Sequence, residues 1–237
     1  AFFDPYINYL LNYLNEKALD SSQAYFTNRQ KTDFNIKKLK LIKSHIKGNV
    51  LRNNLARAVA FEELMKIENH ESHEKFLKQY LLVNTSKPYL EEVLDLHNDI
   101  ENMSAGKKLP ELRLQNHQLE IVSTNKLIKK PTVFYFWSQT QMSHYRSTVL
   151  KAKKLENQFP QYQFKGICIQ PFNEIVFEVH RMLGIKPESQ LAFTDFDIDS
   201  KKWVLSLLNR AIIVDRGGII KEGFANFSSP DFIKTLE

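Results

Sequence analysis

The residues best placed for chemistry follow a dense β-branched and aromatic run at 132–137. Ser138-Gln139-Thr140-Gln141-Met142-Ser143-His144 comes next, and apolar residues then recur at helical spacing. His144 could form a hydrolytic pair with Ser143 or Ser147, because an imidazole can take the proton of a hydroxyl nucleophile. Neither spacing is typical of a catalytic triad and no acidic partner can be assigned. The residues 141–144 are therefore interpreted as the first turn of a helix.

Cys168 is the single cysteine of the chain. One cysteine excludes an intrachain disulfide, a C-x-x-C redox pair and a thiolate zinc cluster. Cys168 lies between Ile167 and Ile169 in an apolar run. A free cysteine in such a run is typically a small, inert hydrophobic residue, so we expect no redox role for it.

Two clusters match metal sites only in part, and we predict no metal. His70 and His73 are three residues apart, without the spacing of a zinc-binding H-E-x-x-H helix. They are better explained as a solvated, polar helix start. The acidic residues that begin at Asp195 resemble a calcium loop, but its sixth and twelfth positions are Ser200 and Ser206. A helix N-cap is expected there.

The charge is distributed unevenly along the 237 residues. The net charge is +6, residues 1–105 are neutral, and all of the excess lies in 106–237. Basic residues do crowd one stretch of the first half, at Lys37, Lys38, Lys40, Lys43, Lys47, Arg52 and Arg57. Because that stretch lacks aromatic residues for base stacking, we interpret it as a solvated helix face, and nucleic-acid binding is not expected. No apolar run approaches the roughly 20 residues of a membrane-spanning helix.

The first half predicts an all-helical domain over 1–105. Apolar spacing, caps and breakers place six helices at 5–14, 20–30, 35–46, 51–65, 76–81 and 87–97. A short, small and charged linker at 104–108 follows. The first residues show no secretion leader, so a leader has been removed or the chain is a fragment of a longer one.

The second half, 106–237, changes to an alternating β and α pattern. Strands are predicted at 112–114, 119–122, 132–137, 164–169, 191–193, 211–215 and 219–221, and helices at 142–159, 172–183, 203–208 and after Pro230. Arg216-Gly217-Gly218 indicates a tight turn between the last two strands. This order predicts an α/β domain with helices on both faces of a sheet.

Three segments of the second half resemble the TlpA/ResA-like thiol–disulfide oxidoreductases of bacterial envelopes, which have a thioredoxin fold. They are GKKLPELRL at 106–114, VFYFW at 133–137 and IIVDRGGII at 212–220. The resemblance covers about 106–237 and implies a thioredoxin-like domain after the helical one. It also implies a periplasmic or envelope-associated protein.

The chain departs from that family at its reactive positions. Gln141 and His144 stand where the resemblance places the two cysteines, and Asn209 stands where it places a cis-proline. Disulfide exchange needs an attacking thiolate and a second, resolving thiol, and an amide and an imidazole supply neither. We expect no dithiol redox activity and no cofactor.

The predicted function is non-catalytic binding of a protein or peptide through the vestigial groove. Its residues are Trp137, Met142, Ser143, Asn209 and Arg210, beside Gln141 and His144. Amide, imidazole and guanidinium donors next to an aromatic ring would suit an extended peptide or an acidic group. Two alternatives stay open: an enzyme of non-redox chemistry that uses His144, and a scaffold domain that supports the helical module.

Overall fold

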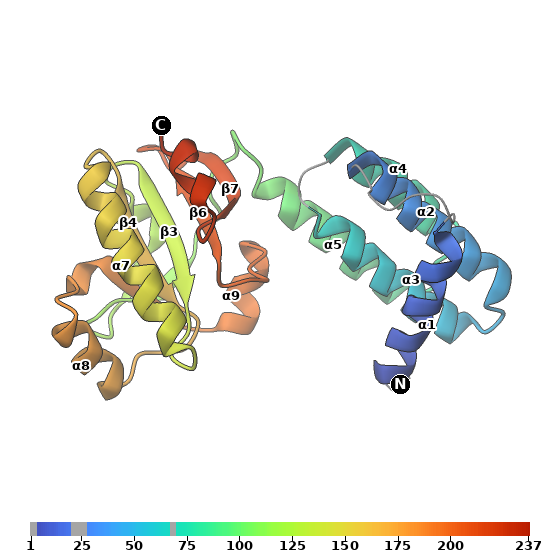
Figure 1. Ribbon diagram of the computed structural model, residues 1–237, viewed down its shortest axis with the longest axis horizontal. Coiled ribbons are helices and arrows are strands. Elements are labelled where there is room, and N and C mark those ends of the chain that lie inside the picture. Colours follow the sequence, from blue (N-terminus) through green and yellow to red (C-terminus); the bar gives the residue numbers. More distant parts are fainter. Residues whose placement is uncertain (1–3, 20–27, 67–69) are drawn as a thin grey trace. The chain divides into compact units, whose positions relative to one another are not determined.

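The computed structural model describes residues 4–19, 28–66 and 70–237. The chain divides into two compact units, Ala1–Asn98 and Asp99–Glu237 (Figure 1). The domain boundary predicted at 105/106 lies shortly after this division and stays a prediction. Within the described residues, no helix is long and apolar enough to cross a membrane.

The first unit is helical, as predicted. Its helices are α1 (Asp4–Ala18), α2 (Asn28–His45), α3 (Asn49–Leu64), α4 (His70–Leu81) and α5 (Lys87–Asn102), the last of which crosses the division between the units. The helix expected at 20–30 falls mostly outside the described residues, and its last three residues begin α2. Helix α2 packs against α1, α3 and α4. Apolar side chains that it buries completely include Leu39 and Ile42.

Polar residues also hold α2 to α3. Lys38 has no exposed side-chain surface and its ammonium pairs with Glu62, 2.5 Å away. The amide of Asn35 donates to the buried carboxylate of Glu63 over 2.7 Å. The expectation of a solvated basic face is therefore wrong for Lys38. Its position on α2 turns it toward α3, which the charge pattern alone does not reveal.

The second unit contains seven strands and four α-helices, all within its fully described range. The strands are β1 (Arg113–Gln115), β2 (Ile121–Ser123), β3 (Thr132–Trp137), β4 (Gln163–Cys168), β5 (Gln190–Phe193), β6 (Arg210–Val214) and β7 (Ile220–Asn226). The helices are α6 (Thr124–Leu127), α7 (Met142–Gln158), α8 (Glu174–Met182) and α9 (Phe196–Lys202), with 3-10 turns at η1 (Pro187–Ser189) and η2 (Pro230–Thr235). The predicted α/β class is confirmed.

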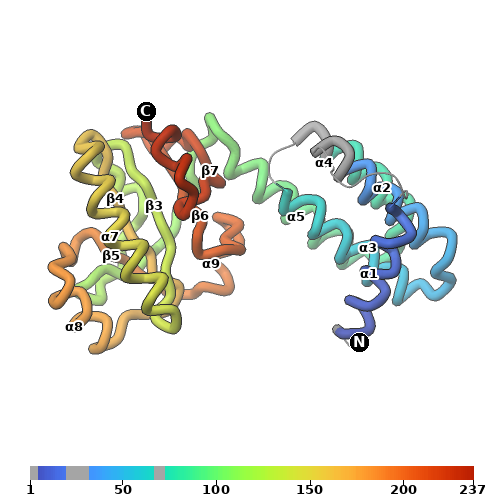
Figure 2. The backbone as a smooth tube through the Cα atoms, in the orientation of Figure 1, coloured from blue at the N-terminus to red at the C-terminus, as the bar shows by residue number. Residues whose placement is uncertain are grey.

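One mixed sheet organises this unit, with the strand order β2-β1-β5-β4-β3-β6-β7. Strand β3 pairs in parallel with β4 and antiparallel with β6, and β6 turns back into β7. Every residue of β3 is buried, as its continuous apolar sequence predicts. Figure 2 shows α7 lying along β3 and β4.

The two faces of β3 have separate cores because side chains alternate along a strand. Val133, Tyr135 and Trp137 belong to the cluster that includes residues of α7, α8 and η2. On the other face, the rings of Phe134 and Phe136 pack against Trp203, which follows α9. The helix predicted at 203–208 is wrong: α9 ends at Lys202, and Val204 has a φ of 51°.

Backbone bonds fix the segment predicted as a linker. The amide of Gly106 donates to the carbonyl of Ile220, and that of Leu109 donates to the carbonyl of Gly218. Gly223 leaves space for the carbonyl of Met103, which a Cβ at this position would strike. The segment 104–108 therefore lies against the sheet edge at β7.

Candidate functional site

The first turn of α7 lies at the end of the sheet where β3 and β4 stop (Figure 1). Gln141 is the N-cap residue, but its side chain makes no capping hydrogen bond. Gln141 and Ser143 are exposed, whereas Met142 and His144 are half-buried. These residues form the predicted helix start at the positions that the family resemblance assigns to a dithiol.

An amide and hydroxyl network holds the turn before α7. The side-chain oxygen of Gln170 accepts from the backbone amide of Gln139 over 3.0 Å, and its amide group donates to Ser138 Oγ over 2.9 Å. Asn173 Nδ2 donates to Gln139 Oε1 over 2.6 Å, and Gln139 Nε2 donates to the carbonyl of Pro171. The ends of β3 and β4 are thereby joined. The sequence shows polar residues directly after both strands, and sequence analysis missed that they meet.

Cys168 lies beside this network and is fully buried. Its sulfur is 3.7 Å from Gln139 Nε2 and 3.6 Å from Gln170 Oε1. Burial raises the pKa of the Cys168 thiol to about 11. The thiolate required for disulfide exchange is therefore almost absent at neutral pH, which agrees with the inert role expected from the sequence.

His144 contacts its own helix. Its Nε2 is 3.4 Å from Thr148 Oγ1, one turn along α7. Ser147 Oγ donates to the backbone carbonyl of His144, not to the ring. Within the described residues, no carboxylate is hydrogen-bonded or ion-paired to the imidazole. The hydrolytic pair considered from the sequence gains no support from this geometry.

Trp137 does not line an open groove. Its side chain is completely buried, its ring centroid lies 4.1 Å from that of Tyr145, and its Nε1 donates to Gln190 Oε1 over 3.1 Å. Gln190 Nε2 in turn donates to the hydroxyl of Tyr135 over 2.9 Å. The expectation that Trp137 lines the binding groove is wrong because Trp137 is the last residue of a buried strand and faces the helices that cover it.

Arg210 faces away from α7. Its guanidinium donates to the carbonyls of Gly223, Trp203 and Val204 and lies 4.1 Å from the ring centroid of Phe224. Burial lowers its pKa to about 9. The expectation of a guanidinium facing the start of α7 is wrong, since β6 alternates and Arg210 lies on the face opposite to its neighbour Ala211.

Asn209 is half-buried beside β7. Its carbonyl accepts from the backbone amide of Phe227 over 2.6 Å, and its side-chain amide is 3.4 Å from Asn226 Oδ1. No cis peptide bond occurs in the described part of the chain.

The strand β3, helix α7, strand β4 and antiparallel pair β6–β7 now define the second unit. It is a thioredoxin fold without a dithiol.

The solved structures that are similar to this unit include thiol–disulfide oxidoreductases and a thiol peroxidase. A thioredoxin domain of a Bacteroides vulgatus thiol–disulfide oxidoreductase matches 56% of this chain and 99% of its own length, at 18% identity and a TM-score of 0.45. A Bacteroides fragilis thiol–disulfide oxidoreductase matches 54% and 95%, at 16% identity and a TM-score of 0.44. A thiol peroxidase of Chromobacterium violaceum matches 55% of this chain and 83% of its own length, at 13% identity and a TM-score of 0.46. No family model and no curated protein matches the chain.

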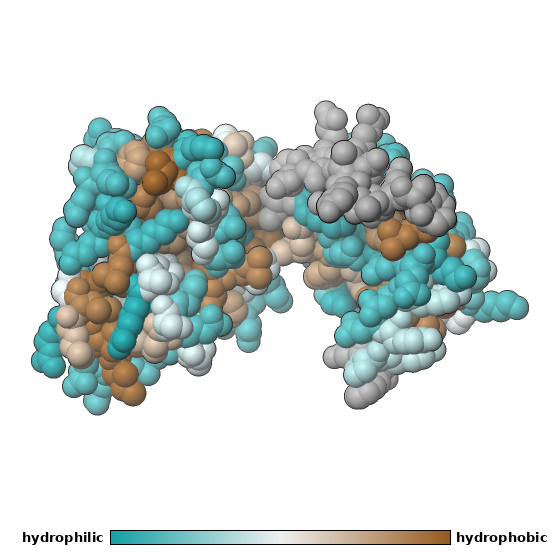
Figure 3. Space-filling model, in the orientation of Figure 1, coloured by the Kyte–Doolittle hydropathy of each residue, from teal (hydrophilic) through white to brown (hydrophobic). Residues whose placement is uncertain are grey.

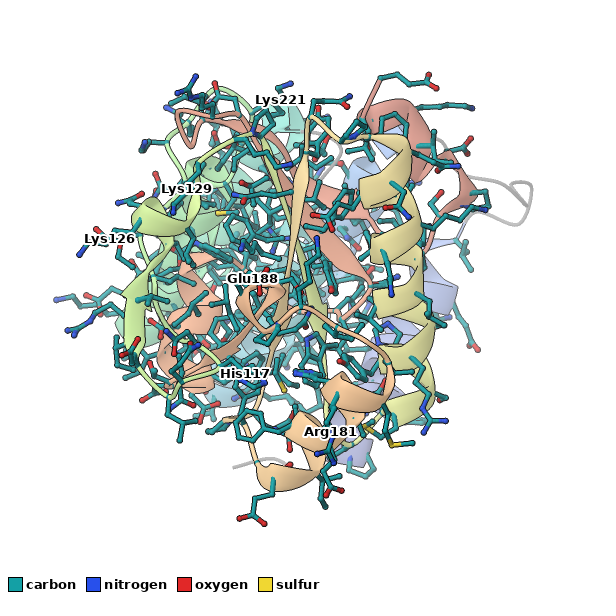
Figure 4. All side chains as sticks on the ribbon, turned by 90° about the vertical axis from the view of Figure 1, so that its left-hand side faces the viewer. His117, Lys126, Lys129, Arg181, Glu188 and Lys221 are labelled. Atoms are coloured by element: carbon teal, nitrogen blue, oxygen red, sulfur yellow. The ribbon has the colours of Figure 1, made fainter. Side chains whose placement is uncertain are left out.

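A ring cluster under α8 is a feature of this thioredoxin fold that sequence analysis missed. His180 is 1% exposed, and its ring centroid lies 5.8 to 5.9 Å from those of Trp137, Tyr145 and Phe172. His117, which Figure 4 labels, lies in the β1–β2 turn. Its ring centroid is 5.8 Å from that of His180. Both His180 nitrogens are buried with no hydrogen-bond partner. The available sequence signal was the spacing of His180, four residues after the buried Val176.

Proposed function

We propose that the thioredoxin-fold unit is a non-catalytic module that binds a protein or peptide at the start of α7. The observation that carries the proposal is the amide network of Ser138, Gln139, Gln170 and Asn173. It holds in place a turn whose side chains supply no attacking thiol. A fixed surface without a reacting group is suited to recognition, because less conformational entropy is lost when a partner binds.

The composition of the surface supports the same proposal. Exposed Gln141 and Ser143 flank the half-buried Met142, and the first turn of a helix offers backbone N–H donors. On α8, at the same end of the sheet, Ile175 and Met182 expose 68% and 80% of their area. Figure 3 shows apolar atoms gathered over this end of the unit. Apolar side chains beside polar donors are typical of protein-binding surfaces.

The proposal excludes dithiol redox catalysis and includes a periplasmic or envelope-associated location, which rests on the family resemblance alone. Asn209 stays in the proposed surface as a prediction. Trp137 is not part of the proposed surface because α7 covers it. Arg210 is not part of it either, because Arg210 lies on the face of the sheet opposite to α7. His144 stays as a half-buried neighbour of Met142 and Ser143.

Selection of peptides from a random display library on the purified whole chain tests the proposal. A double variant, Met142→Glu with Ser143→Arg, alters the start of α7. Lys126→Glu, on the exposed part of α6, is the matched control. We expect the double variant to bind the selected peptides at least about tenfold more weakly, the equivalent of about 1.4 kcal/mol. The control should bind them with unchanged affinity. Equal binding by all three proteins would overturn the proposal and favour the scaffold alternative.

A further inference from the structure

Helix α8 is attached to the thioredoxin-fold unit by few side chains. Its buried residues are Val176 and His180. The remaining apolar residues on it are half-buried or, like Ile175 and Met182, exposed. A helix that buries so little has a low local free energy of opening. The protonation state of His180 should therefore have a large effect on the free energy of opening of α8.

The surroundings of His180 suit a neutral ring and oppose a charged one. Trp137 from β3, Tyr145 from α7 and Phe172 from the loop after β4 surround the imidazole. Among the described residues, no carboxylate is hydrogen-bonded or ion-paired to it. A charge placed there would lose its hydration without gaining a partner.

The charged and titratable neighbours strengthen this effect. The β1–β2 turn contributes His117, whose ring centroid lies 5.8 Å from that of His180 and whose charge repulsion lowers the pKa of His180. Tyr145 stays uncharged because burial raises its pKa. On α8 itself, Glu178 and Arg181 are exposed. The ring cluster thus offers His180 a like charge from His117 and no buried carboxylate.

A capping hydrogen bond holds the start of α8, and a glycine follows its end. At its start, Asn173 Oδ1 accepts from the amide of Val176 over 3.0 Å. At its end, Gly184 has a φ of 60°, a conformation in which glycine is favoured. A cavity of about 500 Å³ lies beside His180 and is lined also by His117, Phe177 and Arg181. Solvent therefore already reaches one side of the cluster.

We propose that protonation of His180 releases α8 from the sheet, so that this helix is an acid-operated cover over the rings of Trp137 and Tyr145. The neutral ring packs among the aromatic residues and keeps the cover closed. The charged ring moves out of the aromatic cluster into water, and α8 moves away from the sheet with it. The proposal does not depend on the binding function proposed above, since it concerns the closed and open states of the chain alone.

Desolvation by burial, and then the proximity of His117, lower the pKa of His180 from 6.5 to about 4. The released ring recovers the higher value, so the open state binds protons more readily. Opening should therefore become roughly tenfold or more frequent between pH 7 and pH 5.

Hydrogen–deuterium exchange of the full chain tests the proposal. Rates in a peptide that covers 174–182 are compared at pH 7 and pH 5, after correction for the intrinsic effect of pH on amide exchange. We expect at least about tenfold faster opening at pH 5 in α8, and little change in the middle of α7. His180→Phe, or His180→Gln if the former fails to fold, should abolish the difference. His144→Gln, which alters another histidine of the same unit, should retain it.

A second variant gives the inference an independent check. His117→Gln removes the like charge, so a charged His180 is opposed less strongly in the closed state. Opening of α8 should then need a lower pH, while the transition itself is kept. Exchange in α8 that does not respond to pH in the natural chain would overturn the proposal. So would an undiminished response in the His180 variants.

Discussion

Gly166 of β4 lies opposite Gln190 of β5, and the absence of a side chain on Gly166 makes room for the amide of Gln190. A Cβ at Gly166 would collide with Gln190 Oε1 and would lie 2.7 Å from the hydroxyl oxygen of Tyr135. The same amide accepts from Trp137 Nε1 and donates to Tyr135. One glycine thus permits the buried network that fixes the last residue of β3.

Gly166→Ala should lower the free energy of unfolding by about 2–4 kcal/mol, because overpacking and loss of buried hydrogen bonds add together. Urea unfolding followed by circular dichroism measures the change. Gly48→Ala is the matched control, since a Cβ at Gly48 meets nothing within 4 Å. A loss no greater than that of the control would show that Gln190 moves aside without cost.

Arg210→Ala should destabilise the chain by about 2–4 kcal/mol, because the buried carbonyls of Gly223, Trp203 and Val204 lose their charged donor. Arg216→Ala, in the exposed hairpin turn, should change stability by less than about 0.5 kcal/mol. Thermal and urea unfolding of the two variants give the comparison. Near-equal stabilities would contradict the structural role of Arg210.

Glu62→Gln should cost more than a typical surface mutation, about 1–3 kcal/mol, because the amide leaves the ammonium of the buried Lys38 side chain without its counter-charge. Burial lowers the pKa of Lys38, and its contact with Glu62 opposes that shift. Glu91→Gln is the control, because Glu91 pairs with an exposed lysine on α5. If both variants unfold at the same urea concentration, the Lys38–Glu62 pair contributes no more than a surface pair.

The chain should not reduce insulin disulfides above background, with or without Cys168→Ser, because it lacks a second thiol. The Cys168 thiol, with a pKa of about 11 and no exposed surface, should react with a disulfide reagent at pH 8 at least about tenfold more slowly than in urea. Turnover above background, or equal rates of labelling in the two conditions, would overturn the interpretation of the site.

Local sequence patterns were enough to predict β3, α7 and the β6–β7 hairpin. In the hairpin, Asp215 Oδ1 accepts from the amide of Ile219 over 2.8 Å and Gly218 has a φ of 74°. The acidic start of α9 is also as expected, because Asp195 caps it by accepting from the amide of Ile198. Each of these features depends on residues within a few positions of one another.

Features that depend on distant partners were predicted less well. Whether Arg210 faces α7 depends on the pairing of β6 with β3, and whether Trp137 is covered depends on α7 and α8. Within the helix predicted at 172–183, the apolar Ile175 is exposed while the polar His180 is buried. Trp137 from β3 and Tyr145 from α7 help to decide the orientation of α8, and the local pattern does not contain them.

The positions of the two tryptophans have a spectroscopic consequence. Trp137 and Trp203 are the only tryptophans of the chain, both are fully buried, and both belong to the unit Asp99–Glu237. Intrinsic tryptophan emission therefore reports the unfolding of the thioredoxin-fold unit, whereas far-ultraviolet ellipticity includes the helices of both units. Comparison of the two denaturation curves would reveal whether the units unfold as one cooperative system or in succession.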